Sequence, residues 1–110
     1  MIKDYDVVIE NLNETTKNRF KELYEIVLEV TSGNVEERLW AKLPSLYYGE
    51  SFVRIIPFKD HINLEAKAIS SHKNELIGYK ITPKGMLQIF NNQSIPVEVV
   101  KVIIHQSLLA

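Results

Sequence analysis

The stretch SFVRIIPFKDHINLEA, residues 51–66, decides how this chain folds, because both of its halves are rich in strand-forming side chains. The first half, residues 51–58, has apolar side chains on both faces of an extended chain: Phe52, Ile56 and Phe58 on one, and Val53, Ile55 and Pro57 on the other. The chain reverses at Lys59-Asp60, and residues 61–66 return as the second strand of a hairpin. Each apolar face of a strand needs a cover, so the fold depends on what covers the second one.

The register of this hairpin has two alternatives, since no Asn-Gly or Asp-Gly pair fixes the turn. A two-residue loop places Arg54 opposite Glu65 and puts His61 on the face of Phe52. A three-residue loop moves every side chain of residues 61–66 to the opposite face. We favour the two-residue loop, because it groups the aliphatic side chains as core and pairs opposite charges across the strands.

In the favoured register the second face carries aromatic side chains, a histidine and a charge pair. Such a surface can hold a ligand or pack on a second subunit. In the simpler interpretation, one helix covers each face, and Arg54–Glu65 is an ordinary cross-strand pair. The sequence leaves both interpretations open.

An amphipathic helix is the clearest element before this hairpin. Asn13 is a plausible N-cap, and Ser32-Gly33-Asn34 supplies a C-terminal stop. The helical period gathers an apolar stripe of Phe20, Leu23, Tyr24, Val27, Val30 and Thr31. A shorter helix is expected over residues 4–10.

The remaining elements are strands and two further helices. Residues 36–44 and 45–49 read as short strands broken by Pro44, and residues 81–90 read as a turn followed by a strand, with Pro83 and Gly85 in the turn. A short helix is expected over residues 70–77, capped by Ser70 or Ser71. A C-terminal helix opens at Ile95-Pro96, with Pro96 at its first position and a stripe of Val99, Val100, Ile103, Ile104 and Leu108. The order predicts an α+β fold: a mainly antiparallel sheet of about five strands, flanked by an N-terminal and a C-terminal helix.

Composition limits the function. The chain has 110 residues, 45% of them hydrophobic and 25% charged, which indicates one globular domain over residues 1–110. Its net charge of −1 gives no general attraction to nucleic acid or an anionic membrane. The absence of cysteine excludes disulfides, thiolate metal sites and cysteine nucleophiles. With no signal-peptide core and no apolar run near ~20 residues, we expect a cytoplasmic protein without a membrane segment.

Charge is uneven along the chain, with nine acidic and four basic residues in residues 1–37. Glu22, Glu25 and Glu29 share one face of the first long helix, and hard cations such as iron or calcium bind several carboxylate oxygens. These three residues are therefore the candidate metal ligands. A solvated helix face has the same pattern.

Other constellations point to no particular chemistry. His61, His72 and His105 lack the spacing of a zinc site, and residues 82–85 lack the glycine spacing of a phosphate loop. No nucleophile–base pair or cofactor motif is recognisable, so an enzyme is not the favoured interpretation. Aromatic residues are numerous, but the basic residues are dispersed, which argues against nucleic-acid binding.

Four segments nevertheless resemble the YdhG-like family of small bacterial domains. They are Trp40 to Pro44, Phe58-Lys59 with His61-Ile62, Gly78-Tyr79-Lys80 with Lys84-Gly85, and Ile95-Pro96. The resemblance extends over nearly the whole chain from the first long helix onward. It implies a compact α+β domain with an antiparallel sheet, mostly without an assigned activity. One branch is described as a frataxin-like intracellular iron chaperone, which would give the acidic helix face a role.

These observations favour a non-enzymatic binding domain without a cofactor. It would engage a small molecule or a protein partner through a sheet surface made by Trp40, Tyr47, Arg54, Phe58, Lys59, His61 and Tyr79. The alternative is a frataxin-like iron chaperone that binds iron weakly on the acidic helix face. Both a monomer and a homodimer are compatible with the sequence.

Overall fold

The fold is described by a computed structural model that covers all residues from Met1 to Ala110. Its centre is one six-stranded sheet in the order β1-β2-β3-β4-β6-β5, in which every neighbouring pair is antiparallel. The strands are β1 (Glu36–Trp40), β2 (Leu43–Tyr48), β3 (Ser51–Pro57), β4 (His61–Glu65), β5 (Lys80–Ile81) and β6 (Leu87–Phe90). The helices are η1 (Lys3–Tyr5), α1 (Asp6–Ile9), α2 (Glu14–Thr31), η2 (Lys67–Glu75) and α3 (Val97–Leu108). The α+β prediction is confirmed, with β5 as the additional strand.

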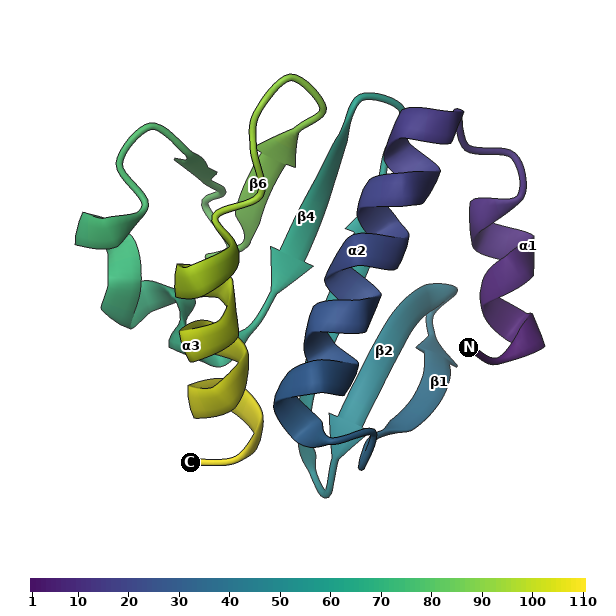
Figure 1. Cartoon of the computed structure of the whole chain (residues 1–110), viewed down its shortest axis with the longest axis horizontal. Helices are drawn as coiled ribbons and strands as arrows, with labels where there is room; N and C mark the ends of the chain where they lie inside the picture. The colour runs from purple at the N-terminus through teal and green to yellow at the C-terminus, as the bar shows by residue number, and fades with distance from the viewer.

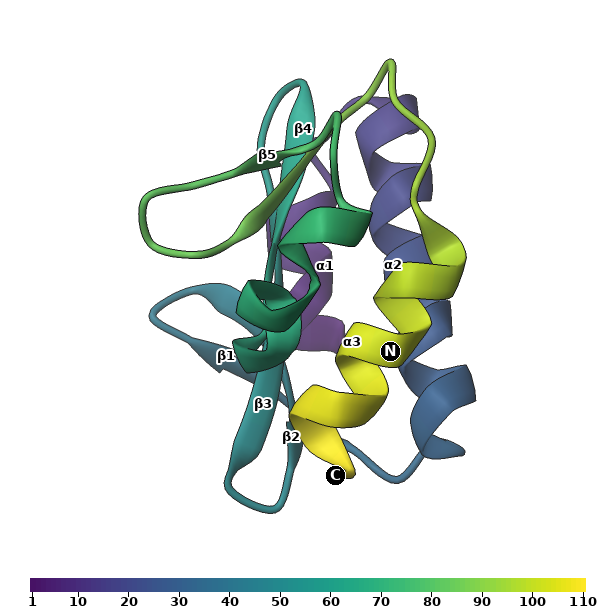
Figure 2. The same cartoon turned by 90° about the vertical axis from the view of Figure 1, so that its left-hand side faces the viewer.

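Both long helices lie on the same face of the sheet (Figures 1 and 2). Seen from the edge in Figure 2, α2 and α3 form one layer and the strands form the other. The simpler sequence interpretation, with one helix on each face, is therefore wrong. The molecule has two layers, and no helix covers the outer face of the sheet.

Helix α2 begins and ends as its sequence predicts. The Asn13 side chain accepts a hydrogen bond from the backbone N–H of Thr16 at 2.9 Å, and Ser32 ends the helix in the left-handed conformation with φ of 53°. Asn13 also donates through Nδ2 to the carbonyl of Lys59 at 2.8 Å. The N-cap thus ties the start of α2 to the β3–β4 turn.

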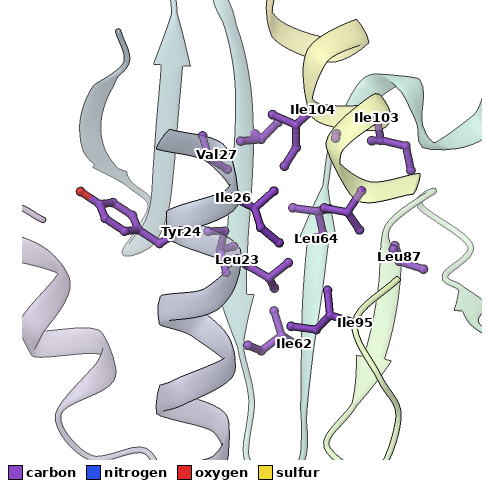
Figure 3. Close-up of a cluster of buried hydrophobic side chains, with 14 of the residues drawn as sticks. Leu23, Tyr24, Ile26, Val27, Ile62, Leu64, Leu87, Ile95, Ile103 and Ile104 are labelled. Carbon is purple, nitrogen blue, oxygen red and sulfur yellow. The ribbon is translucent and has the colours of Figure 1, made fainter. Parts of the chain in front are cut away.

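The core fills the space between the two layers. Aliphatic side chains from α2, β4, β6 and α3 point toward one another in this space (Figure 3). Strand β3 contributes Val53 and Ile55, both fully buried. Because apolar burial is the main favourable contribution to folding, this layer holds the helices against the sheet.

The register of the β3–β4 hairpin is the one favoured from the sequence. Arg54 pairs with Glu65 and Pro57 with Ile62. The backbone N–H of Phe58 donates to the carbonyl of His61 at 2.9 Å, which closes a two-residue turn at Lys59-Asp60. This register puts the aliphatic side chains of both strands into the core.

The N-terminal segment is anchored to the sheet by polar contacts. The Tyr5 hydroxyl donates to the Ser45 carbonyl at 2.6 Å, and the Tyr24 hydroxyl donates to Glu37 at 2.7 Å. Glu37 also accepts from the backbone N–H of Ile2 at 2.9 Å. Burial is the main cause that raises the pKa of both tyrosines well above the ordinary value, and the nearby Glu37 carboxylate is the second.

The break between the first two strands differs from the prediction. It lies at Ala41-Lys42, where both residues have positive φ angles of 49° and 67°, and Pro44 lies inside β2. Pro44 pairs with Leu39 of β1, and pairing with β3 begins only at Ser45. Because Pro44 is paired with β1 but not with β3, its missing N–H leaves no gap in the β2–β3 hydrogen bonds, and the proline is tolerated inside the strand. Two consecutive non-glycine residues in the left-handed conformation are rare, so the sequence did not indicate a turn at Ala41-Lys42.

Two helix starts also differ from the prediction. Helix η2 begins at Lys67 rather than at Ser70 or Ser71, and it has no side-chain cap. It consists of two short turns separated at His72, whose φ of −123° is not helical. Pro96 is the residue before the first helical residue of α3 rather than the first itself. The turn at Thr82–Gly85 is as predicted, with the Gly85 N–H donating to the Thr82 carbonyl at 2.8 Å.

His72 joins η2 to α3 and gives the fold a pH dependence. Its ring nitrogens lie 2.7 Å from Glu75 Oε1 and 2.7 Å from Gln106 Oε1, and only the protonated ring donates to both. The hydrogen bond to Gln106 is the main cause that raises the pKa of His72 above its ordinary 6.5, and the hydrogen bond to Glu75 is the second. A raised folded pKa stabilises the fold below the unfolded pKa, and this contribution is lost as the pH rises through the folded pKa.

We therefore expect the free energy of unfolding to fall as the pH rises above about 6.5. His72→Gln should flatten this decline in urea titrations across the pH range, whereas His105→Gln, at an exposed position, should leave it unchanged. Identical pH profiles for the wild type and His72→Gln would contradict the assignment.

Candidate functional site

The outer face of the sheet, turned away from α2 and α3, is called the open face below. Strand alternation and the observed registers place on it Arg38, Trp40, Tyr47, Phe52, Arg54, Ile56, Phe58, His61, Asn63, Glu65, Gln88 and Phe90. In Figure 2 this is the side away from the helices, and the β1–β2 and β5–β6 turns extend outward on it. The open face is thus lined by aromatic, amide and charged side chains.

The centre of the open face is dry although no helix covers it. Arg54 is 5% exposed and Ile56 is 7% exposed. Asn63 and Gln88 are also buried, and Gln88 Nε2 donates to Asn63 Oδ1 at 3.2 Å. Neighbouring side chains of the same sheet shield this region. The chain around Ile55 therefore has no wet side.

Arg54 is the most constrained polar side chain on this face. Its guanidinium donates to Ser45 Oγ at 2.9 Å, to Glu65 Oε1 at 3.2 Å and to the Tyr47 hydroxyl at 3.4 Å. It also lies between two rings, 4.3 Å from the centroid of Trp40 and 3.8 Å from that of Phe52. Hydrogen bonds and stacking on both faces fix the guanidinium plane.

The stacking continues toward the edge of the sheet. Phe52 contacts Tyr47 with centroids 5.7 Å apart, and Arg38 lies 4.4 Å over the Tyr47 ring. Arg38 donates two hydrogen bonds of 2.8 Å to Glu36, which raise the pKa of Arg38 and lower that of Glu36. Both side chains of this outer pair are exposed to water, so screening weakens the pair.

A second aromatic group lies at the other end of β3. The His61 ring stacks on Phe58 with centroids 4.5 Å apart and planes inclined by 12°, and it contacts Phe90 at 5.3 Å. His61 Nδ1 lies 2.7 Å from Asp60 Oδ1, and this hydrogen bond lowers the pKa of Asp60. The carboxylate orients the ring and leaves Nε2 available.

Two large apolar side chains remain exposed on the open face, one on the edge strand β1 and one just after the end of β3. Trp40 is 54% exposed and Phe58 is 42% exposed. Both rings contact fixed neighbours, Arg54 for Trp40 and His61 for Phe58. Exposed aromatic residues beside a buried arginine are typical of the residues that dominate binding interfaces.

A hollow of about 520 Å³ adjoins the open face beside Phe52. Three segments line it: the β2–β3 turn, the junction of β4 with η2, and the β5–β6 turn. Its lining consists of Glu50, Ser51, Phe52, Glu65, Ala66, Lys67, Ser70, Lys84 and Gly85. Its volume lies within the range of small-molecule sites.

Five of the seven predicted binding residues share the open face: Trp40, Tyr47, Arg54, Phe58 and His61. The other two residues lie outside the strands of this face: Lys59 is exposed in the β3–β4 turn, and Tyr79 precedes β5. The Lys59 carbonyl faces the start of α2, where it accepts hydrogen bonds from Asn13 and Thr16. Tyr79 packs against the core and donates its hydroxyl to the Ser94 carbonyl at 2.6 Å.

The sequence-based set omitted residues that the structure brings to the site. Phe52 and Glu65 hold Arg54, and strand alternation in residues 51–66 already indicated their face. Lys67 and Lys84 meet at the hollow from segments far apart in the chain. No sequence signal connects these two lysines.

The predicted metal ligands Glu22, Glu25 and Glu29 are exposed along α2 and do not form a metal site. Nowhere in the chain do three carboxylate or imidazole side chains lie close enough to hold a metal ion. Glu29 instead forms an ion pair of 3.4 Å with Lys101 of α3. Iron binding on this helix stays a prediction that the side-chain geometry does not support.

The fold and the site together define an α+β domain with one helical face and one open, aromatic face. Comparisons with protein-family models, with curated proteins and with solved structures gave no match. The resemblance to the YdhG-like family stays a prediction. None of the helices has both the length and the apolar character needed to cross a membrane.

Proposed function

We propose that this chain is a non-enzymatic binding domain that engages a small ligand or a protein partner through its open face. The fixed position of Arg54 between Trp40 and Phe52 is the observation that carries this proposal. A guanidinium held in place loses little conformational entropy when a partner binds beside it. The binding surface is therefore ordered before any partner arrives.

The distribution of exposure supports the same function. Trp40 and Phe58 are accessible beside a dry centre, and the hollow adjoins that centre at Phe52. Burying the two exposed rings would give a partner apolar contact area. The polar groups around them would orient the partner.

Native mass spectrometry of the chain purified from the cells that normally express it tests this function. We expect an additional bound mass, either a small molecule or a polypeptide, in the wild type. The double substitution Trp40→Ala/Phe58→Ala should remove that mass. Val7→Ala/Val102→Ala is the matched control, because it removes two exposed apolar side chains away from the open face.

Two results would contradict the proposal. One is a wild-type chain that carries no additional mass. The other is a mass that the Trp40→Ala/Phe58→Ala chain retains as fully as the control. Circular dichroism of all variants ensures that a lost mass reports on the surface rather than on unfolding.

A further inference from the structure

The charges around the hollow beside Phe52 indicate what kind of small ligand it binds. We propose that it binds a small organic anion with a flat ring, whose anionic group contacts Lys67 and Lys84 and whose ring contacts Phe52. This inference rests on the proposed function, because Phe52 and Glu65 belong to both the hollow and the open face.

The two lysines of the hollow have no acidic partner in the chain. The ion pairs of the structure involve other bases, so neither Lys67 nor Lys84 has a carboxylate within salt-bridge distance. Glu65, the acid nearest to the centre of the open face, is already bonded to Arg54 at 3.2 Å. Two ammonium groups on separate segments are therefore available to one anion.

Glu50 is the remaining charge of the lining, and it forms no ion pair either. The hollow thus has two free cationic groups and one free anionic group. The balance favours an anion, and the Glu50 carboxylate weakens that attraction. Removing the Glu50 charge should consequently tighten binding, which a purely apolar hollow would not show.

Phe52 supplies an aromatic ring whose position is already fixed. Arg54 lies 3.8 Å from its centroid, and Tyr47 contacts it at 5.7 Å. Because Phe52 is part of the hollow's lining, a flat ligand ring can pack against it. Phe52 is the only aromatic residue of the lining, so it determines where the ring of a ligand lies.

The loop that carries Lys84 is also formed in advance. Within the β5–β6 turn, Thr82 accepts from Gly85 N–H at 2.8 Å and from Met86 N–H at 3.1 Å, and its own N–H donates to the Met86 carbonyl at 2.8 Å. Gly85 has a φ of 89°, which a glycine adopts without strain. These bonds hold the Lys84 backbone at the rim, so binding needs to order only its side chain.

Nuclear magnetic resonance titration of the full-length chain tests the inference with three aromatic anions of different shape: AMP, 1-naphthyl phosphate and indole-3-acetate. Adenosine, 1-naphthol, indole and inorganic phosphate are the matched probes that lack either the charge or the ring. We expect at least one aromatic anion to shift the amides of Ser51, Phe52, Lys67 and Gly85 saturably at up to millimolar concentration. Its matched uncharged probe and phosphate should each bind about tenfold more weakly or worse.

Substitutions then assign the contacts. The double substitution Lys67→Gln/Lys84→Gln should lower the affinity for the tightest-binding aromatic anion by about tenfold or more. Lys42→Gln/Lys59→Gln, which removes two lysines outside the lining, should leave its affinity unchanged. Glu50→Gln should raise the affinity for the anion. Phe52→Leu should lower the affinity for the aromatic anion and leave the affinity for inorganic phosphate unchanged.

The inference is overturned if none of the three anions shifts those amides, or if the two double lysine variants bind equally well. These failures differ from failure of the proposed function. A co-purified mass that depends on Trp40 and Phe58, without anion binding in the hollow, would leave the proposed function standing. Conversely, if the hollow binds an anion but the co-purified mass does not depend on Trp40 and Phe58, the anion site stands and the proposed function fails.

Discussion

Replacing Arg54 with alanine is expected to lower the free energy of unfolding by about 3 kcal/mol, because the substitution breaks a buried, charged network. Three acceptors lose their donor: Ser45 Oγ, Glu65 and the Tyr47 hydroxyl. Glu65 is one-third exposed and regains some hydration, which keeps the loss near the lower end for buried pairs. The stacked side chain also disappears from between two rings, so packing is lost with the charge.

Urea denaturation of Arg54→Ala measures this loss, and Arg38→Ala is the matched control. Arg38 lies on the same face on β1, which β2 separates from β3; it stacks on Tyr47 and pairs with Glu36, but its pair is accessible to water. Its removal should hardly move the denaturation midpoint. Arg54→Lys should recover only part of the loss, because an ammonium cannot stack between two rings and bond three acceptors in one plane. Equal midpoints for Arg54→Ala and Arg38→Ala would show that the network contributes nothing.

The same comparison connects stability to the binding surface. Arg54 holds Phe52, and Phe52 lines the hollow. The residue that fixes the fold of the open face therefore also fixes the ring that the proposed ligand contacts. Stability and binding should decline together in Arg54→Ala, whereas Trp40→Ala/Phe58→Ala should affect mainly binding, since both rings are exposed.

The elements that local patterns determine were predictable from the sequence. The α2 cap at Asn13 and the turn at Pro83 and Gly85 are properties of a few adjacent residues. The β3–β4 register was also predictable, because only one register buries the aliphatic side chains of both strands. Five of the predicted binding residues followed from that register or from strand alternation nearby.

What depends on contacts between distant segments was not predictable. Whether α2 and α3 share a face of the sheet is decided by packing between residues far apart in the chain. The hydrophobic periodicity of each helix carries no information about this packing. Tyr79 looked like a surface aromatic, yet its hydroxyl meets a carbonyl at Ser94 after the chain has passed through β5 and β6. Lys67 and Lys84 line the same hollow for the same reason. The hollow is a product of topology, since two turns and the junction of β4 with η2 come together to line it.

The two faces of β3 should respond differently to the loss of the same side chain. Ile55→Ala is expected to cost about 3–4 kcal/mol of unfolding free energy, because Ile55 is fully buried beneath the helices and leaves a cavity that they cannot collapse into. Ile56→Ala removes an equal volume from the next position, which faces the open side and is nearly as buried. Its cost should be about 2 kcal/mol or less, since single side chains rather than a helix cover it and can move into the space.

Urea denaturation of both variants, with circular dichroism as the probe, measures the difference. A two-layer molecule predicts that Ile55→Ala has the lower midpoint by a clear margin. Equal losses would mean that the open face is as firmly covered as the core, as it would be beneath a permanent partner subunit. Sedimentation of the wild type at several concentrations separates that case, because a second subunit on the open face would appear as a concentration-dependent dimer. The ratio of the two losses therefore measures how firmly the open face is covered around Ile56.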